Sequence, residues 1–165
     1  MRHTIKKRFG QHFLNDAGII ADMMLAIDPK PDDSIIEIGP GMGALTEPLL
    51  TKLKRLIIIE IDRDLIQYWQ KQYSEDRLKI IAGDVLALDL SLLPDRFRFV
   101  GNLPYNISTP ILMKIRDVSD RLVDAHFMLQ KEVVDRIVAA PGSKTYGRLS
   151  IMVQTHFDVE HLLDV

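Results

Sequence analysis

The stretch of sequence that decides the fold is Ser34-Ile35-Ile36-Glu37-Ile38-Gly39-Pro40-Gly41-Met42-Gly43. Its first half is short and β-branched, which is typical of a buried strand, and its second half supplies closely spaced glycines. A glycine turn after a strand lets a nucleotide-type ligand approach the backbone, because no Cβ stands in the way. The dinucleotide fingerprint Gly-x-Gly-x-x-Gly would put its third glycine at Ala44, so a pyrophosphate cradle, a ligand without phosphates and a purely structural turn all stay open.

The same strand pattern recurs and alternates with helical periodicity. Further strands are predicted over residues 55–61, 78–82, 97–100 and 125–129, and a final one over 155–165. Helices are predicted over residues 17–27, 44–53, 63–73, 109–118, 131–139 and 147–154. Apolar strands that alternate with helices indicate a mostly parallel sheet with helices on both faces. The predicted fold class is therefore a Rossmann-like, doubly wound α/β domain that takes in residues 1–165.

Two acidic residues follow the second and third predicted strands. Glu60 ends an apolar run about 20 residues beyond the glycines, where an acid on this fold accepts the hydroxyls of a ribose. Asp62 is expected to cap the next helix instead. Asp84 lies at the same edge of the sheet and is a candidate acceptor for an adenine amino group, with a turn or helix cap as the alternative.

Gly101-Asn102-Leu103-Pro104-Tyr105, after the fourth predicted strand, is the most specific motif. This motif suits the positioning of an exocyclic adenine amine for methylation. Such an amine is a poor nucleophile because its lone pair is delocalised into the ring, and attack on a sulfonium methyl requires the lone pair to be aimed along the transfer axis. We expect the Asn102 amide oxygen and the Leu103 carbonyl to accept its two hydrogens, Pro104 to stiffen the loop and Tyr105 to stack on the base. The alternative is an Asn-x-Pro turn with a tyrosine in the core.

Composition sets wider limits. The chain has 165 residues, a formal charge of −2 and no cysteine, and it has no apolar run near the roughly 20 residues that span a bilayer. We therefore expect cytoplasmic residence, no membrane partner and no metal site.

Positive charge gathers in an N-terminal arm, about residues 1–16, at Arg2, Lys6, Lys7 and Arg8. This arm is either an RNA contact or a solubilising tail.

Taken together, the motifs resemble those of the ribosomal RNA small-subunit adenine dimethyltransferases, which are class I methyltransferases. The resemblance rests on Lys7-Arg8-Phe9-Gly10-Gln11-His12-Phe13-Leu14, Glu37-Ile38-Gly39-Pro40-Gly41, Glu60-Ile61-Asp62, Gly83-Asp84, Asn102-Leu103-Pro104-Tyr105-Asn106-Ile107-Ser108, His126-Phe127-Met128-Leu129-Gln130-Lys131-Glu132-Val133 and Tyr146-Gly147-Arg148-Leu149-Ser150. It implies S-adenosylmethionine as the donor and N6-dimethylation of two adjacent adenines near the 3′ end of small-subunit rRNA. It also implies a late role on immature small ribosomal subunits.

The resemblance assigns residues as well. The implied cofactor contacts are His12, Leu14, Gly39, Gly41, Glu60, Asp84 and Asn102, and Asn102 also serves the target amine. Some family members carry Asn where this chain has His12, and both side chains donate hydrogen bonds. Lys131, Lys144 and Arg148 are candidates for a wider RNA-facing surface, although charges on solvated helix faces explain them equally well.

In one respect the chain departs from the family pattern. Family members normally continue with a final strand and a small helical C-terminal domain, which are absent from residues 1–165. We therefore expect a weakened fold with an exposed strand edge that favours self-association.

Three functions remain as alternatives to an rRNA adenine dimethyltransferase. They are a noncatalytic RNA-binding assembly module, a NAD-dependent oxidoreductase, which the Asn102 motif disfavours, and a DNA or protein methyltransferase with a related loop.

Overall fold

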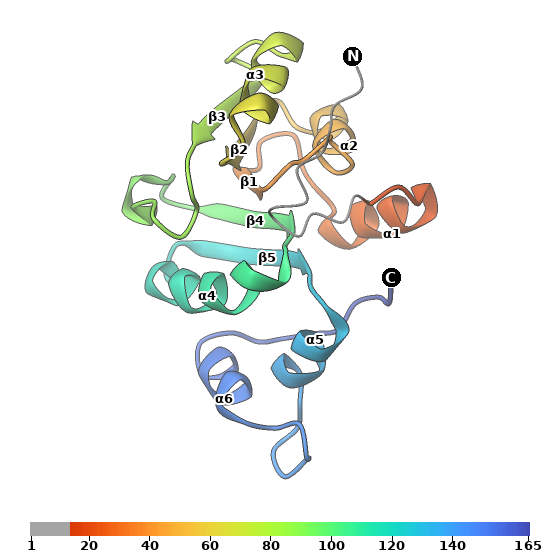
Figure 1. Ribbon diagram of the computed structural model, residues 1–165, viewed down its shortest axis with the longest axis vertical. Helices are drawn as coiled ribbons and strands as arrows, with labels where there is room; N and C mark the ends of the chain where they lie inside the picture. Colours follow the sequence, from red (N-terminus) through yellow and green to blue (C-terminus); the bar gives the residue numbers. More distant parts are fainter. Residues whose placement is uncertain (1–13) are drawn as a thin grey trace.

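The computed structural model describes residues 14–165 and shows a single five-stranded parallel sheet (Figure 1). The strands lie in the order β3-β2-β1-β4-β5, and every neighbouring pair is parallel. Their bounds are β1 Ile35–Ile38, β2 Leu56–Glu60, β3 Leu78–Ala82, β4 Phe97–Asn102 and β5 Leu122–Met128. Because β1 and β4 are neighbours, the direction of strand progression reverses between them. This reversal is the switch point at which open α/β sheets bind ligands.

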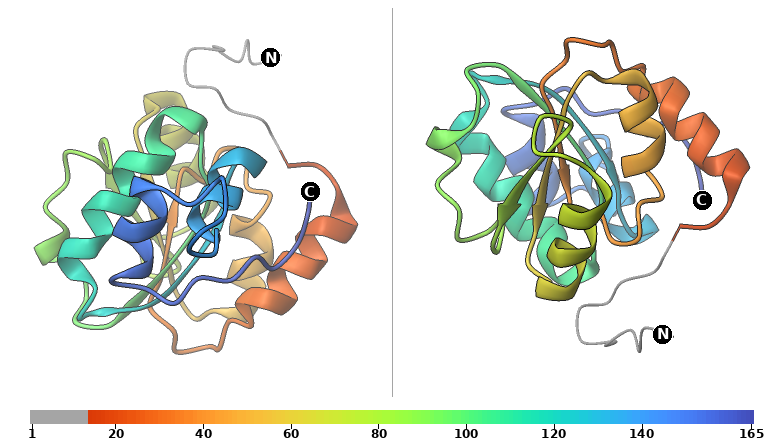
Figure 2. Two further views of the ribbon diagram at one scale, coloured as in Figure 1. Left: turned by 90° about the horizontal axis from the view of Figure 1, so that it is seen from below. Right: turned by 90° about the horizontal axis from the view of Figure 1, so that it is seen from above.

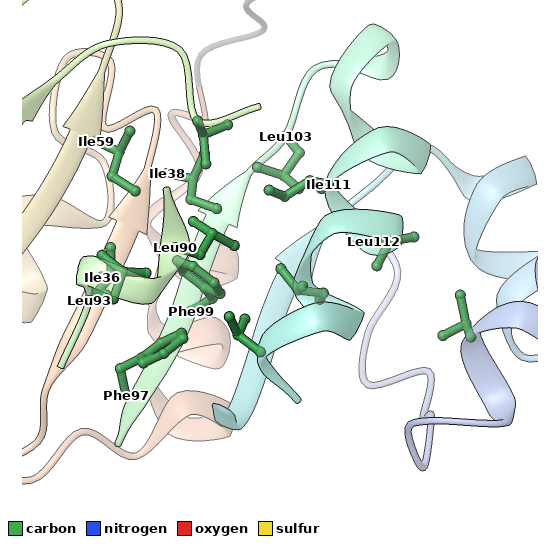
Figure 3. Close-up of a cluster of buried hydrophobic side chains, with 14 of the residues drawn as sticks. Ile36, Ile38, Ile59, Leu90, Leu93, Phe97, Phe99, Leu103, Ile111 and Leu112 are labelled. Atoms are coloured by element: carbon green, nitrogen blue, oxygen red, sulfur yellow. The ribbon is translucent and has the colours of Figure 1, made fainter. Parts of the chain in front are cut away.

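Helices cover both faces of this sheet, as the two views of Figure 2 show. They are α1 Ala17–Ile27, α2 Thr46–Lys52, α3 Arg63–Gln72, α4 Tyr105–Ile115, α5 Lys131–Ile137 and α6 Arg148–Gln154, with short 3₁₀ turns η2 Leu90–Leu92 and η3 Arg116–Val118. Side chains that alternate along each strand separate the core into two clusters. Ile36 and Phe99 pack with Ile111 of α4 on one face (Figure 3), whereas Ile35 and Ile58 pack toward α1, α2 and α3 on the other. The predicted doubly wound α/β class is confirmed.

Most predicted elements are present with small shifts at their ends. The predicted helix 17–27 has the observed bounds of α1, and the Asp16 carboxylate caps it by accepting from the backbone N–H groups of Gly18 and Ile19. The fourth helix begins at Tyr105 instead of residue 109, so Pro110 lies inside it. A start at residue 109 had put Pro110 in the first helical turn, where proline is favoured, and this start is four residues too late. Within residues 14–165, no helix combines the length and the apolar character needed to cross a bilayer.

The strand predicted over residues 155–165 is wrong. In the structure this segment has no ladder partner, and its apolar side chains Phe157, Val159 and Leu163 pack against the two core clusters. β-branched and aromatic residues suit a strand, but a strand also needs a neighbouring backbone with which to pair. β5 is therefore an outer strand of the described sheet, and it lines a cavity of about 840 Å³ together with residues 156–165.

Candidate functional site

A cavity of about 690 Å³ opens at the carboxyl ends of β1, β4 and β5. Its walls come from Leu14, the glycine loop that follows β1, the Asn102–Tyr105 loop that follows β4, and residues 128–131 that follow β5. The parallel register brings these three strand ends to one edge of the sheet, with Ile36 beside Phe99 and Asn102 beside Met128. Segments far apart in sequence thus meet at the topological switch point.

The glycine loop adopts a conformation that side chains disfavour. Gly39 and Gly41 have φ angles of 66° and 54°, and the Gly39 N–H donates to the Ile59 carbonyl at 2.9 Å, which ties the loop to β2. Both residues line the cavity. The two glycines present no Cβ to the cavity at these positions, as close approach of a ligand to the backbone requires.

The end of β4 lies close against the end of β1 because Gly101 has no side chain. A Cβ at Gly101 would lie 2.8 Å from the Ile38 carbonyl oxygen, which is closer than real Cβ contacts. The next residue, Asn102, is half-buried and lines the cavity, and the Leu103 N–H donates to the Met128 carbonyl at 3.1 Å. Tyr105 is 57% exposed at the cavity wall, so the alternative of a tyrosine buried in the core is wrong.

Glu60 ends β2 inside the protein and is only 2% exposed. Its Oε1 accepts from the N–H groups of Ile61 and Asp62, at 2.8 and 2.9 Å. Its Oε2 is buried, and within residues 14–165 no hydrogen-bond partner reaches it. Burial raises the pKa of Glu60 and repulsion from Asp62 adds to it, partly offset by the backbone N–H groups of Asp62, Ile61 and, most weakly, Gly41. A buried acceptor without a donor is costly, so this oxygen is suited to a ligand hydroxyl.

The neighbouring acids have different roles. Asp62 caps α3 by accepting from the N–H groups of Asp64 and Leu65, which confirms the predicted cap. Asp84 is exposed, and its carboxylate accepts from the Leu86 N–H at 2.9 Å, which is the turn geometry of the alternative interpretation. Neither Glu60 nor Asp84 is among the residues that line the 690 Å³ cavity. Adenine recognition by Asp84 therefore stays a prediction.

Few of the basic residues predicted to contact RNA can be placed at the cavity. Arg2, Lys6, Lys7, Arg8 and His12 lie outside the described residues. Lys144 and Arg148 are exposed, in the loop before α6 and at its first residue, and do not line the cavity, whereas Lys131 does. Of the cations proposed for an RNA-facing surface, Lys131 alone among residues 14–165 borders the cavity. Residues 14–165 also contain no group of three or more His, Asp or Glu side chains that could hold a metal ion.

Sequence reasoning missed Glu37 as a site residue. Glu37 lines the cavity although it is only 2% exposed, and its Oε2 accepts from the Thr46 hydroxyl at 2.7 Å. Burial raises the pKa of Glu37 to about 8, and repulsion from nearby Glu60 adds to the effect, against the Thr46 hydrogen bond that lowers it. The available clue was an acid inside the apolar run Ile35-Ile36-Glu37-Ile38, since a glutamate is almost never fully buried unless its side chain is paired.

Known proteins match this arrangement in sequence and in structure. A family model described as ribosomal RNA adenine dimethylase matches residues 2–165. Proteins named ribosomal RNA small subunit methyltransferase A are 54% identical in Methylobacillus flagellatus, over all of this chain and 65% of the relative, and 56% identical in Cupriavidus metallidurans, over 99% of this chain and 59% of the relative. The chain thus spans about three-fifths of the length of these relatives.

Solved structures agree with the fold. A dimethyladenosine transferase from Plasmodium falciparum superposes with a TM-score of 0.71 at 33% identity, over 87% of this chain and 52% of that one. The 23S rRNA methyltransferase ErmE superposes with a TM-score of 0.70 at 26% identity, over 86% of this chain and 55% of that one. On the family match and the identities above 50%, this chain belongs to the ribosomal RNA adenine dimethylase family.

Proposed function

We propose that this chain is the S-adenosylmethionine-binding catalytic domain of an enzyme that dimethylates N6 of two adjacent adenines near the 3′ end of small-subunit rRNA. The observation that carries the proposal is the shared cavity: the glycine loop and the Asn102–Tyr105 loop line the same 690 Å³ space. A donor held on one loop would thus lie beside an acceptor held on the other. Two relatives above 50% identity bear the name ribosomal RNA small subunit methyltransferase A, which supports rRNA as the substrate.

The residues at the site fit the proposed donor. The left-handed backbone at Gly39 and Gly41, which carries no Cβ, admits a ligand to the cavity. The buried Oε2 of Glu60 does not line this cavity, and we propose it as the acceptor for a ribose hydroxyl that reaches past the glycine loop. The full set that would hold the donor is His12, Leu14, Gly39, Gly41, Glu60, Asp84 and Asn102. S-adenosylmethionine supplies a methyl group on a cationic sulfur.

The chain itself would contribute positioning. The Asn102 amide oxygen and the Leu103 carbonyl would accept the two hydrogens of the adenine amine and aim its lone pair, and the exposed ring of Tyr105 offers a stacking surface. The positive charge of the sulfonium would pass to the amine nitrogen as the S–C bond breaks and the N–C bond forms, and the methylated nitrogen would then be acidic enough to release its proton to water, so the chain needs no strong general base. A paired adenine must first be unstacked, at a cost of a few kcal/mol, so accessible adenines are favoured.

The proposed partner is rRNA within an immature small ribosomal subunit, met in the cytoplasm. Net charge of −2 gives no overall attraction to RNA, so binding must rely on a local basic surface. Arg2, Lys6, Lys7 and Arg8 in the N-terminal arm, with Lys144 and Arg148, are the proposed contacts. Their contribution should decline with rising salt, because each phosphate contact releases counterions.

Methyl transfer tests the proposal directly. Labelled S-adenosylmethionine is incubated with undermethylated small subunits and this chain, and the rRNA nucleosides are analysed by mass. We expect N6-dimethyladenosine with the wild type and loss of nearly all incorporation with Asn102→Ala, while RNA binding changes little. RNA binding without any incorporation by the wild type would instead favour the noncatalytic assembly module. Unchanged incorporation by Asn102→Ala would refute the role of the loop.

We also propose that the outer edge of β5 favours self-association of this chain. Within residues 14–165 no strand pairs with that edge, and unpaired edges recruit other strands. Sedimentation over a range of concentrations should show reversible dimers. A strictly monomeric chain at all concentrations would contradict this proposal without affecting catalysis.

A further inference from the structure

Trp69 on α3 reaches across to the glycine loop from outside the cavity. It is completely buried and is the only tryptophan in the chain. Its indole Nε1 donates to the Gly41 carbonyl oxygen at 3.1 Å, a contact that joins residues 28 positions apart. Trp69 itself does not line the cavity, whereas Gly41 does. The hydrogen bond therefore links a residue behind the site to one of its walls.

The same edge of the indole fills the space left by Gly43. A Cβ built on Gly43 would lie 2.5 Å from Cη2 and 3.0 Å from Cζ2 of Trp69, far inside ordinary contact distance. Gly43 has a φ of 99°, and the Glu47 N–H at the start of α2 donates to its carbonyl at 3.1 Å. The indole thus touches the loop at two points, by a hydrogen bond at Gly41 and by packing at Gly43.

The ring is in turn held on its other sides. Tyr68 meets it edge-on, with ring centroids 5.0 Å apart, and Tyr73 stacks on it at 6.1 Å. Leu65 belongs to the same buried cluster. An indole packed among aromatic rings has little freedom to move, so it can hold the loop carbonyl in one place.

We propose that Trp69 is a positioning residue that fixes the glycine loop in the shape that receives the methyl donor, and that its fluorescence reports occupancy of the site. The inference rests on the proposed function, because it takes the cavity to be the donor site. A loop of glycines is conformationally free, and ordering it upon binding would weaken affinity. Prior restraint at Gly41 and Gly43 removes that cost. Indole emission depends on hydrogen bonding at Nε1, so a ligand that touches Gly41 should change it.

The test is titration of the intact chain with S-adenosylhomocysteine, the demethylated form of the donor, by calorimetry and by tryptophan emission. For the wild type we expect a saturable emission change with the same Kd as the calorimetric one. Trp69→Phe removes the N–H donor and part of the ring, and it should weaken binding about tenfold, as expected for one lost buried hydrogen bond. All affinities are measured where denaturation curves show the protein to be folded.

Two variants, one in α3 and one at the residue that ends it, separate positioning from general stability. Leu65→Val removes buried apolar volume, and Tyr73→Phe removes only the hydroxyl of the ring that stacks on the indole. Both should keep the wild-type affinity even if they unfold at lower denaturant concentration. If Trp69→Phe binds as tightly as the wild type, or if its loss of affinity is matched by Leu65→Val, Trp69 is not a positioning residue.

The wild-type titration is decisive even if Trp69→Phe fails to fold. Calorimetric binding without any change in emission would overturn the proposal for Trp69 and leave the proposed function intact. No binding heat and no emission change at millimolar ligand would overturn donor binding itself, and the role of Trp69 with it.

Discussion

Glu37→Gln should change the way in which the stability of this protein depends on pH. The Glu37 side chain is 2% exposed, and burial raises its pKa to about 8 from the ordinary value of 4.5. At pH 7 the folded protein therefore holds a proton on Glu37 that the unfolded chain has released. A folded state that binds more protons than the unfolded state loses stability as pH rises, so the contribution of Glu37 is full below pH 4.5 and declines up to about pH 8.

The size of this effect follows from the interval between the two pKa values, 4.5 and about 8. Each pH unit within it changes the free energy of unfolding by about 1.4 kcal/mol, so Glu37 should cost the wild type about 3 kcal/mol between pH 5 and pH 7. Gln cannot ionise but keeps the shape and an amide oxygen that can accept from the Thr46 hydroxyl, as Oε2 does at 2.7 Å. The difference in unfolding free energy between Glu37→Gln and the wild type should thus grow in favour of the variant as pH rises.

Urea unfolding followed by circular dichroism at pH 5, 6 and 7 measures this difference. Glu47→Gln is the matched control, because Glu47 is an exposed glutamate in the first turn of α2, the helix that carries Thr46. The control should run parallel to the wild type at all three values. If the Glu37→Gln and wild-type curves were also parallel, Glu37 would be ionised in the folded protein and the reasoning from burial would be refuted.

Three other substitutions test the geometry that surrounds the site. Gly101→Ala should destabilise the protein by about 2 kcal/mol and reduce methyl transfer, because its Cβ would lie 2.8 Å from the Ile38 carbonyl oxygen; thermal unfolding and the rRNA assay measure both, and a fully active, equally stable variant would contradict the close approach. Arg98→Met should cost about 3 kcal/mol in urea unfolding, because half-buried Arg98 pairs with Asp33 at 2.7 Å and with Asp124 at 2.9 Å, and both carboxylates would lose their arginine; a change below a few tenths of a kcal/mol would show that these pairs are dispensable. Asp62→Ala should lose about 1 kcal/mol through the missing cap of α3 while donor affinity stays unchanged, and weaker calorimetric binding would mean that Asp62 also contacts the donor.

The sequence predicted the parts of the site that depend on local chemistry. Strand, glycine turn and helix follow one another over a few residues, so the pattern from Ile35 to Gly43 indicated both the fold class and the loop that lines the cavity. Asn102 and Tyr105 were identified from a loop motif after a strand, and the structure brings both to the same cavity. Parallel strands end at one edge of their sheet, so residues after each strand end meet there regardless of their separation in sequence.

Properties that depend on partners distant in the chain were predictable only in part or not at all. The strand expected over residues 155–165 is absent, because propensity cannot supply a neighbouring backbone. Asp84 was expected at the same edge of the sheet as the glycines because it follows β3, but its carboxylate makes a local turn and Asp84 is not among the residues that line the cavity.

By itself the sequence determined the doubly wound α/β fold, its family and the loops that form the site, because periodicity, glycine spacing and loop motifs are properties of neighbouring residues. Only the tertiary structure decided that Glu37 keeps its proton near neutral pH and that Trp69 holds the Gly41 carbonyl. Both effects arise from exclusion of water and from contacts across the fold, and neither exists until the helices have packed on the sheet.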